Sequence, residues 1–402
     1  MIQSRPLNRR DFIRGVGAGA LAASALVRSA SAAADPGAAF QHGVASGDPL
    51  ADRVIIWSRV NPGLGAQVAV FWDVALDAGF TRMVRRGRVL ASAATDHTVK
   101  IDVLGLAVNT KFFYRFSALG QNSPVGITRT LPIGSVSSVK LAVFSCSNYP
   151  AGYFNAYADA ALQDADVALH IGDYIYEYAV DGFASSDAAA LGRLSLPATE
   201  LLALSDYRTR YAQYRSDADL QAAHAAFPWI CVWDDHEFAN DTWKTGAENH
   251  QPNEGDFFVR RAAALQAYYE WMPIRAVEPA RPLRAFRSFT FGSLVDLHML
   301  DTRIIGRDQQ LSYGSFFGAG GFNAQAFTAA LTNPARQLLG TEQSQWLGGR
   351  MATTGATWTL VGQQVLMGRM NIPAPVVLQQ ISFSAYSALL FKAATAPATL
   401  TA

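Results

Sequence analysis

The sequence predicts an α/β layered fold preceded by an all-β sandwich domain, and three observations support this. Of the 402 residues, 50% are hydrophobic and 16% are charged, so the chain can bury a large core. Short β-branched and aromatic runs separated by turn residues fill 36 to 132, a spacing typical of a fibronectin- or immunoglobulin-type sandwich. Beyond them, short apolar runs alternate with helical patterns, which predicts a mostly parallel sheet covered by helices.

The first 34 residues (1–34) predict an export signal rather than a folded element. Arg9 and Arg10 precede the apolar stretch "GVGAGALAASALV", and small residues suited to cleavage follow it. The stretch is too short and too glycine-rich to span a bilayer stably, and the paired arginines before Phe12 are typical of the twin-arginine type. A basic amphipathic helix is the alternative. We expect export through the twin-arginine translocation machinery, to the periplasm or the medium.

The charge balance argues against nucleic acid as a partner. The formal net charge is +1, and no long basic run occurs after the signal. Cys146 and Cys231 are the two cysteines, and their different contexts, a loop after a strand and an apolar run, predict two free thiols. We expect a monomer without a transmembrane segment.

The β domain is expected over 35–132 and the α/β domain over 133–402, divided at the link "TLPIGSVSS". Strands are expected in the first domain at 53–60, 66–76, 97–106 and 111–119. In the second, strands are expected at 139–145, 166–171, 229–233, 287–292, 294–300 and 357–366, and helices at 154–164, 205–227, 256–272 and 342–351. Tyr207, Tyr211 and Tyr214 recur on one helix face, which we interpret as core packing rather than a cofactor site.

Three successive strands of the second domain end in residues that can bind metal. The texts that follow these strands are "SCSN", "GDYIYE" and "DDHEFAND". Because the carboxyl ends of parallel strands meet at one edge of a sheet, these side chains should converge. The candidates are Cys146, Asn148, Asp173, Tyr176, Asp234, Asp235, His236, Glu237, Asn240 and Asp241.

The chemistry of these residue types suits a metal site. If a helix starts after Gly172, Asp173 and Tyr176 face the same point, and carboxylate, phenolate and thiolate are donors for trivalent iron. Asp235 with Asn240 or Asp241 offers the oxygen ligands that calcium or magnesium prefers. His236 could protonate a leaving group. Each motif alone has an ordinary explanation, as a surface turn, a structural cysteine or an acidic helix start, but the three together favour a metal site.

The chain resembles the PhoD family of alkaline phosphatases and phosphodiesterases, within the calcineurin-like metallophosphoesterases. The motifs that carry the resemblance are "FQHGVASGDPLADRVIIWSRV", "SCSN", "GDYIYEY", "WDDHEFAND", "LDTR" and "VGQQVLMGRM", together with the leader, so it covers essentially the whole chain. It implies a metallophosphoesterase-like fold and an exported hydrolase of phosphate mono- or diesters that uses iron(III) and calcium.

Carried over by position, the resemblance implies a role for each candidate. Cys146, Asp173 and Tyr176 correspond to iron ligands, with Asp173 shared between metals. Asp235 corresponds to a calcium ligand, with Asn240 and Asp241 as further ones, and His236 to the histidine beside the substrate. Asn148 and Arg303 are candidates for contact with the phosphate ester, although support of the core is the favoured role for Arg303.

Family members continue with a later ligand-bearing motif, whereas the last histidine here is His298 and the sequence stops at Ala402. We therefore expect this chain to lack a ligand, to hold metal weakly, to show little activity and to aggregate. Two alternatives stay open: a non-catalytic exported binding protein whose β domain docks a partner, and an iron-storage or redox protein.

Overall fold

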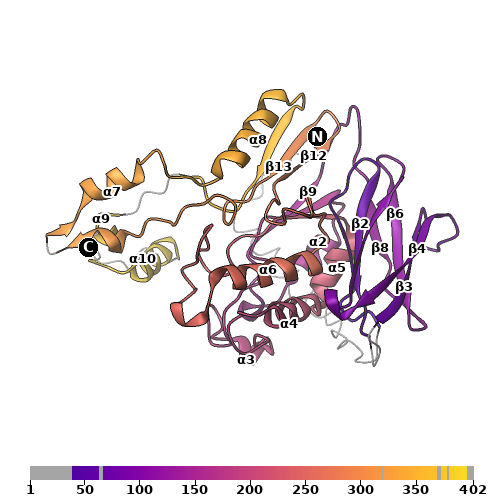
Figure 1. Cartoon of the computed structure of the whole chain (residues 1–402), viewed down its shortest axis with the longest axis horizontal. Coiled ribbons are helices and arrows are strands. Elements are labelled where there is room, and N and C mark those ends of the chain that lie inside the picture. Colours follow the sequence, from indigo (N-terminus) through magenta and orange to yellow (C-terminus); the bar gives the residue numbers. More distant parts are fainter. Residues whose placement is uncertain (1–38, 63–66, 319, 369–372, 378–379, 396–402) are drawn as a thin grey trace, which may run out of the picture.

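The computed structural model describes residues 39–62, 67–318, 320–368, 373–377 and 380–395. The predicted export signal at 1–34 lies outside these residues. Figure 1 shows the early strands gathered on one side, the helices α2 to α6 beside them, and a segment with α7, α9 and α10 extending to the other side. Among the described residues, no helix is long and apolar enough to cross a membrane.

A six-stranded sheet forms the centre of the molecule, in the order β5-β2-β1-β11-β10-β9. Its strands are β1 Val44–Gly47, β2 Arg53–Arg59, β5 Thr98–Leu104, β9 Leu141–Phe144, β10 Val167–His170 and β11 Trp229–Cys231. The last three are parallel neighbours, with Leu169 of β10 level with Val143 on one side and Ile230 on the other. The predicted parallel arrangement is therefore present, and it brings the three polar loops to one edge.

The central sheet crosses the expected domain boundary. Gly47 of β1 pairs in parallel with Trp229 of β11, so three strands from the predicted β domain continue the sheet of the α/β part. The division at 132/133 remains a prediction, because a backbone pairing joins its two sides.

A second sheet lies on the amino-terminal side, in the order β4-β3-β6-β7 with β8 paired to β6. Its strands are β3 Gln67–Ala75, β4 Met83–Ser92, β6 Lys111–Ala118, β7 Gln121–Asn122 and β8 Gly126–Arg129. Buried residues of this sheet, such as Val70 and Phe116, form one hydrophobic cluster with Val54 and Ile56 of the central sheet. Its fibronectin or immunoglobulin type stays a prediction.

A third sheet packs on the central one and is built from β12 Arg287–Phe291, β13 Val295–Met299 and β16 Trp358–Gly362. Phe289 and Leu297 of this sheet share a buried cluster with Leu169 and Ile230. The ends of β10 and β11 are thereby held between two layers, which gives the loops that follow them a rigid base.

The helices mostly match the predicted ones. They are α2 Asn155–Ala161, α3 Ala188–Leu191, α4 Leu204–Arg215, α5 Ala218–Ala226, α6 Phe257–Trp271, α7 Ala324–Leu331, α8 Gly340–Thr353, α9 Ala374–Val377 and α10 Phe383–Thr395, and a small hairpin pairs β14 Phe317–Gly318 with β15 Gly321–Phe322. The helical segment expected over 205–227 is present as two helices, α4 and α5, because the Asp217 side chain accepts from two backbone N–H groups and starts a new helix there. The tyrosine stripe of α4 is fully buried, as expected.

Candidate metal centre

The loops after β9 and β10 are joined through their backbones. Cys146 N donates to Gly172 O at 3.1 Å, and Ser147 N donates to Asp173 O at 2.7 Å. Cys146 and Asp173 both have left-handed backbone conformations, with φ of 59° and 55°. Because such conformations are uncommon for side-chain-bearing residues, the paired loops hold these two side chains in orientations that an ordinary strand end does not produce.

Gly172 allows the loop after β10 to approach the loop after β11. Its φ is 112°, and a β carbon added there would lie 2.3 Å from the β carbon of Asp234. Only glycine fits such a conformation and such a contact. The helix expected to start after Gly172 is wrong, since the structure has no helix over 173–177. Asp173 and Tyr176 nevertheless meet, through the left-handed turn.

Cys146, Asp173 and Tyr176 form the first group of donors. Cys146 Sγ and Tyr176 OH lie 3.5 and 3.4 Å from the same oxygen, Asp173 Oδ2. The other oxygen, Asp173 Oδ1, is buried and accepts no hydrogen bond from any residue that the structure describes. Burial, together with nearby Asp235, raises the pKa of Asp173. A buried carboxylate oxygen without a donor, beside a thiol and a phenol, fits a cation-binding site.

Asp173, Asp235 and His236 form a second, overlapping group, and their potential ligand atoms all lie within 4.8 Å of one another. The His236 ring stacks on Tyr176 at 4.2 Å, and His236 Nδ1 lies 2.7 Å from Glu177 Oε2. Burial disfavours the imidazolium, but the hydrogen bond and charge of Glu177 outweigh it and raise the pKa of His236 to about 9. Nδ1 is therefore engaged by Glu177, and Nε2 is the nitrogen left for other contacts.

Arg303 neutralises part of the acidic charge. Its guanidinium contacts Asp234 through Nε, Asp235 at 3.1 Å and Asp241 at 3.5 Å. Asp241 N in turn donates to Asp235 Oδ2 at 2.5 Å. Burial and the neighbouring Asp235 carboxylate raise the pKa of Asp234 to about 7 despite Arg303. The arginine thus lies against the carboxylates of the third loop.

The amide nitrogens of the two predicted asparagines bond to groups outside this cluster. Asn240 Nδ2 donates to Glu248 Oε2 at 2.9 Å, and its backbone N–H donates to Glu177. Asn148 Nδ2 donates to the Phe183 carbonyl at 3.2 Å, while Asn148 Oδ1 is buried without a partner among the described residues. The structure brings together Cys146, Asp173, Tyr176, Asp235, His236, Asp241 and Arg303, and leaves the side chains of Asn240 and Asn148 beside this group.

Sequence reasoning counted Glu237 only among the metal-binding candidates and assigned no role to Glu177. Both are fully buried, and each accepts hydrogen bonds from the loops that carry the candidate ligands. Their presence inside "GDYIYE" and "DDHEF", directly after buried strands, is a signal that could have found them, because a carboxylate that is buried must be paired.

The fold and this group of side chains define an α/β protein with a candidate cation site at the carboxyl ends of its central strands, and comparisons with known proteins identify its family. The family model "PhoD-like phosphatase" matches residues 141–387, and "PhoD-like phosphatase, N-terminal domain" matches 20–132. Alkaline phosphatase D of Bacillus subtilis (strain 168) is 39% identical over 388 residues, which are 92% of this chain and 64% of that protein. A solved structure titled "Structure of PhoD" matches with a TM-score of 0.73 and 39% identity, over 83% of this chain and 63% of that one.

The chain belongs to the PhoD-like phosphatase family. It spans a little under two thirds of the length of the two relatives named above.

Proposed function

We propose that the protein hydrolyses phosphate esters, mono- or diesters, with the help of bound metal. The observation that carries this proposal is the convergence of Asp173, Asp235 and His236 within 4.8 Å, with Cys146 and Tyr176 both beside Asp173 Oδ2. Buried anions held this close repel one another unless a cation lies between them.

The donor set suggests two kinds of metal. Thiolate, phenolate and carboxylate from Cys146, Tyr176 and Asp173 suit iron(III), and the carboxylates of Asp235 and Asp241 suit calcium. Asn240 donates to Glu248 through Nδ2, so its Oδ1 would be the atom that joins the calcium ligands. Bound metal would supply an activated water and would neutralise the phosphoryl charge.

The chain's own residues would position and protonate the ester. Glu177 fixes the His236 ring through Nδ1, so Nε2 can hold a proton for the leaving oxygen. Arg303 would keep the Asp234–Asp235 loop in place and has further guanidinium N–H groups for a phosphate oxygen. Asn148, whose buried Oδ1 is unpaired among the described residues, would orient the ester rather than react with it.

We also propose that the protein is exported through the twin-arginine pathway and that its β sandwich is a separate domain. The paired arginines before an apolar stretch and a small-residue cleavage region support the first point. The family-model match that ends at 132 supports the second.

Cysteine and tyrosine variants test the iron assignment. Thiolate and phenolate ligands to iron(III) give visible absorption, so Cys146→Ala and Tyr176→Phe should each lose bound iron and this absorption. The measurements are metal analysis, the visible spectrum, and hydrolysis of p-nitrophenyl phosphate and its bis ester with and without a calcium chelator. Full iron content with unchanged, chelator-insensitive turnover in both variants would refute the assignment.

A further inference from the structure

One buried carboxylate connects the loop after β10 to the loop after β11. Glu237 is 0% exposed. Its Oε2 accepts from Asp173 N at 3.1 Å and from Asp234 N at 2.7 Å, and its Oε1 accepts from Tyr174 N at 2.5 Å. A single side chain therefore satisfies three backbone donors that belong to two separate segments of the chain.

These three donors lie at the positions that aim the candidate ligands. Asp173 is itself a ligand candidate, and Asp234 immediately precedes Asp235. The same two loops touch at Gly172, where a β carbon would collide with Asp234. Glu237 bridges the loops at their closest approach, so losing it would let Asp173 and Asp235 move relative to each other.

Both oxygens of the Glu237 carboxylate are engaged by these contacts. All of its hydrogen-bond partners in the described part of the chain are backbone N–H groups, and it forms no ion pair there. The two loops thereby take three of the roughly four acceptor positions of this carboxylate. This separates Glu237 from Asp173, whose Oδ1 accepts nothing from the described residues.

We propose that Glu237 is a positioning residue, which sets the distance between Asp173 and Asp235 by holding both loops through their backbones. The proposal rests on the metal-dependent function proposed above. Outer residues that orient metal ligands typically contribute 10–100-fold to metal affinity, so we expect an effect of about that size.

The test is a calcium titration of the full 402-residue chain by isothermal calorimetry, for the wild type and for Glu237→Gln. Glutamine keeps the size of the side chain but places an NH₂ group against a backbone N–H, whichever way the amide is turned. We expect the calcium affinity of the variant to fall by about 10–100-fold. Glu237→Asp keeps both oxygens on a shorter side chain, so its calcium affinity should lie between those of the wild type and Glu237→Gln. This variant replaces Glu237→Gln in the test if Glu237→Gln does not fold.

Asp217→Asn is the matched control. Asp217 also accepts two backbone N–H bonds, from Asp219 and Leu220, but at the start of α5 and not at the ligand loops. The Asp217→Asn substitution should lower the melting temperature and leave the calcium affinity unchanged, which distinguishes positioning of the ligand loops from a general loss of stability. Equal calcium affinity in the wild type and in a folded Glu237 variant would overturn the positioning role alone. A wild-type chain that binds no calcium would overturn the proposed function, and this role with it.

Discussion

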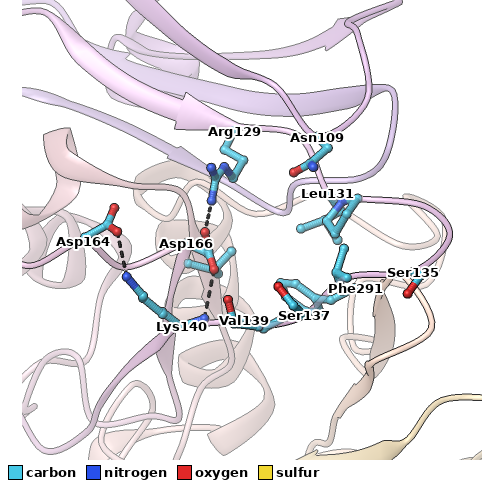
Figure 2. A pocket seen from close by; sticks show the side chains of 14 residues that line it. Asn109, Arg129, Leu131, Ser135, Ser137, Val139, Lys140, Asp164, Asp166 and Phe291 are labelled. Carbon is cyan, nitrogen blue, oxygen red and sulfur yellow. Dashed lines mark hydrogen bonds and ion pairs between the residues drawn. The ribbon is translucent and has the colours of Figure 1, made fainter.

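Acidic side chains cluster at both the amino ends and the carboxyl ends of strands β9 and β10, but the two clusters differ in how basic groups compensate their charge. At the amino ends, Asp164 and Asp166 line a cavity of about 390 Å³ (Figure 2). Figure 2 shows Asp164 paired with Lys140, at 2.7 Å, and Asp166 contacting Arg129 and the backbone of Lys140. Each carboxylate there has a basic partner.

At the carboxyl ends, acidic groups outnumber basic ones. Six carboxylates lie together against Arg303, the nearby Arg307 and His236: Asp173, Glu177, Asp234, Asp235, Glu237 and Asp241. The pKa values differ accordingly, since Lys140 lowers the pKa of Asp164 whereas burial raises that of Asp173. Acidic residues alone therefore do not indicate a cation site. A cation site is indicated by buried acidic residues that outnumber the basic residues around them.

The largest expected effect comes from Asp173. Asp173→Asn removes the anion shared by both donor groups, so iron content and ester hydrolysis should fall by more than the roughly 100-fold typical of outer residues. Metal analysis and turnover with p-nitrophenyl phosphate measure this. Asp166→Asn is the control at the other end of β10 and should leave both unchanged. If the two substitutions had equal effects, the two ends would not differ as described.

A smaller loss of turnover, about 10²-fold, which is the low end for general acid catalysis, is expected for His236→Gln. If Nε2 protonates the leaving oxygen, the loss should be large for an alkyl phosphate and small for p-nitrophenyl phosphate, because p-nitrophenolate leaves without a proton. Glu177→Gln should give an intermediate loss with the same dependence on the leaving group. Identical losses for both esters would exclude the proton-donor role.

The stability of the metal-free chain in acid tests whether strand β10, which lies between the two acidic clusters, is buried. Burial lowers the pKa of His170 from 6.5 to about 3. Between these two pH values His170 is therefore protonated in the unfolded chain and neutral in the folded chain. Stability should therefore fall as the pH drops from 6.5 toward 3, by up to about 1.4 kcal/mol per pH unit for this histidine. Urea unfolding from pH 7 to 5 measures it, and His170→Gln should lower the slope by about one proton.

His236 has the opposite sign, because its pKa is raised to about 9. Its contribution to the stability of the fold is complete below pH 6.5 and is lost as the pH rises through 9.

An unchanged slope of stability against pH in His170→Gln would show that His170 is accessible to protons in the folded state.

The smallest effect is expected at the amino ends. Arg129→Gln breaks a half-exposed ion pair with Asp166, and such pairs typically contribute about 0–1 kcal/mol. Urea unfolding should detect little change, and calcium affinity should match the wild type. A large loss of metal binding in this variant would mean that the amino-end cavity takes part in the site.

Much of this arrangement could be predicted from local patterns. Apolar runs that alternate with helical patterns located β9, β10 and β11, and the polar sequence after each run located the three loops. The strand β4 was missed because "MVRRGRVLAS" is rich in arginine on its exposed face, and no helix follows Gly172 because the left-handed turn at Asp173 depends on the neighbouring loop. Local sequence also could not show that Glu237 faces two distant backbones or that Arg303 reaches Asp234, since both contacts depend on how the loops pack.

The most direct test of a cation site at the carboxyl ends is a calcium titration of two double variants beside the wild type. Asp173→Asn with Asp235→Asn removes the excess negative charge, and Asp164→Asn with Asp166→Asn removes two acids that are already paired. We predict that the first double variant loses calcium binding and that the second binds as the wild type does. Equal binding in all three proteins, or a loss in the second variant alone, would contradict the assignment of the metal centre.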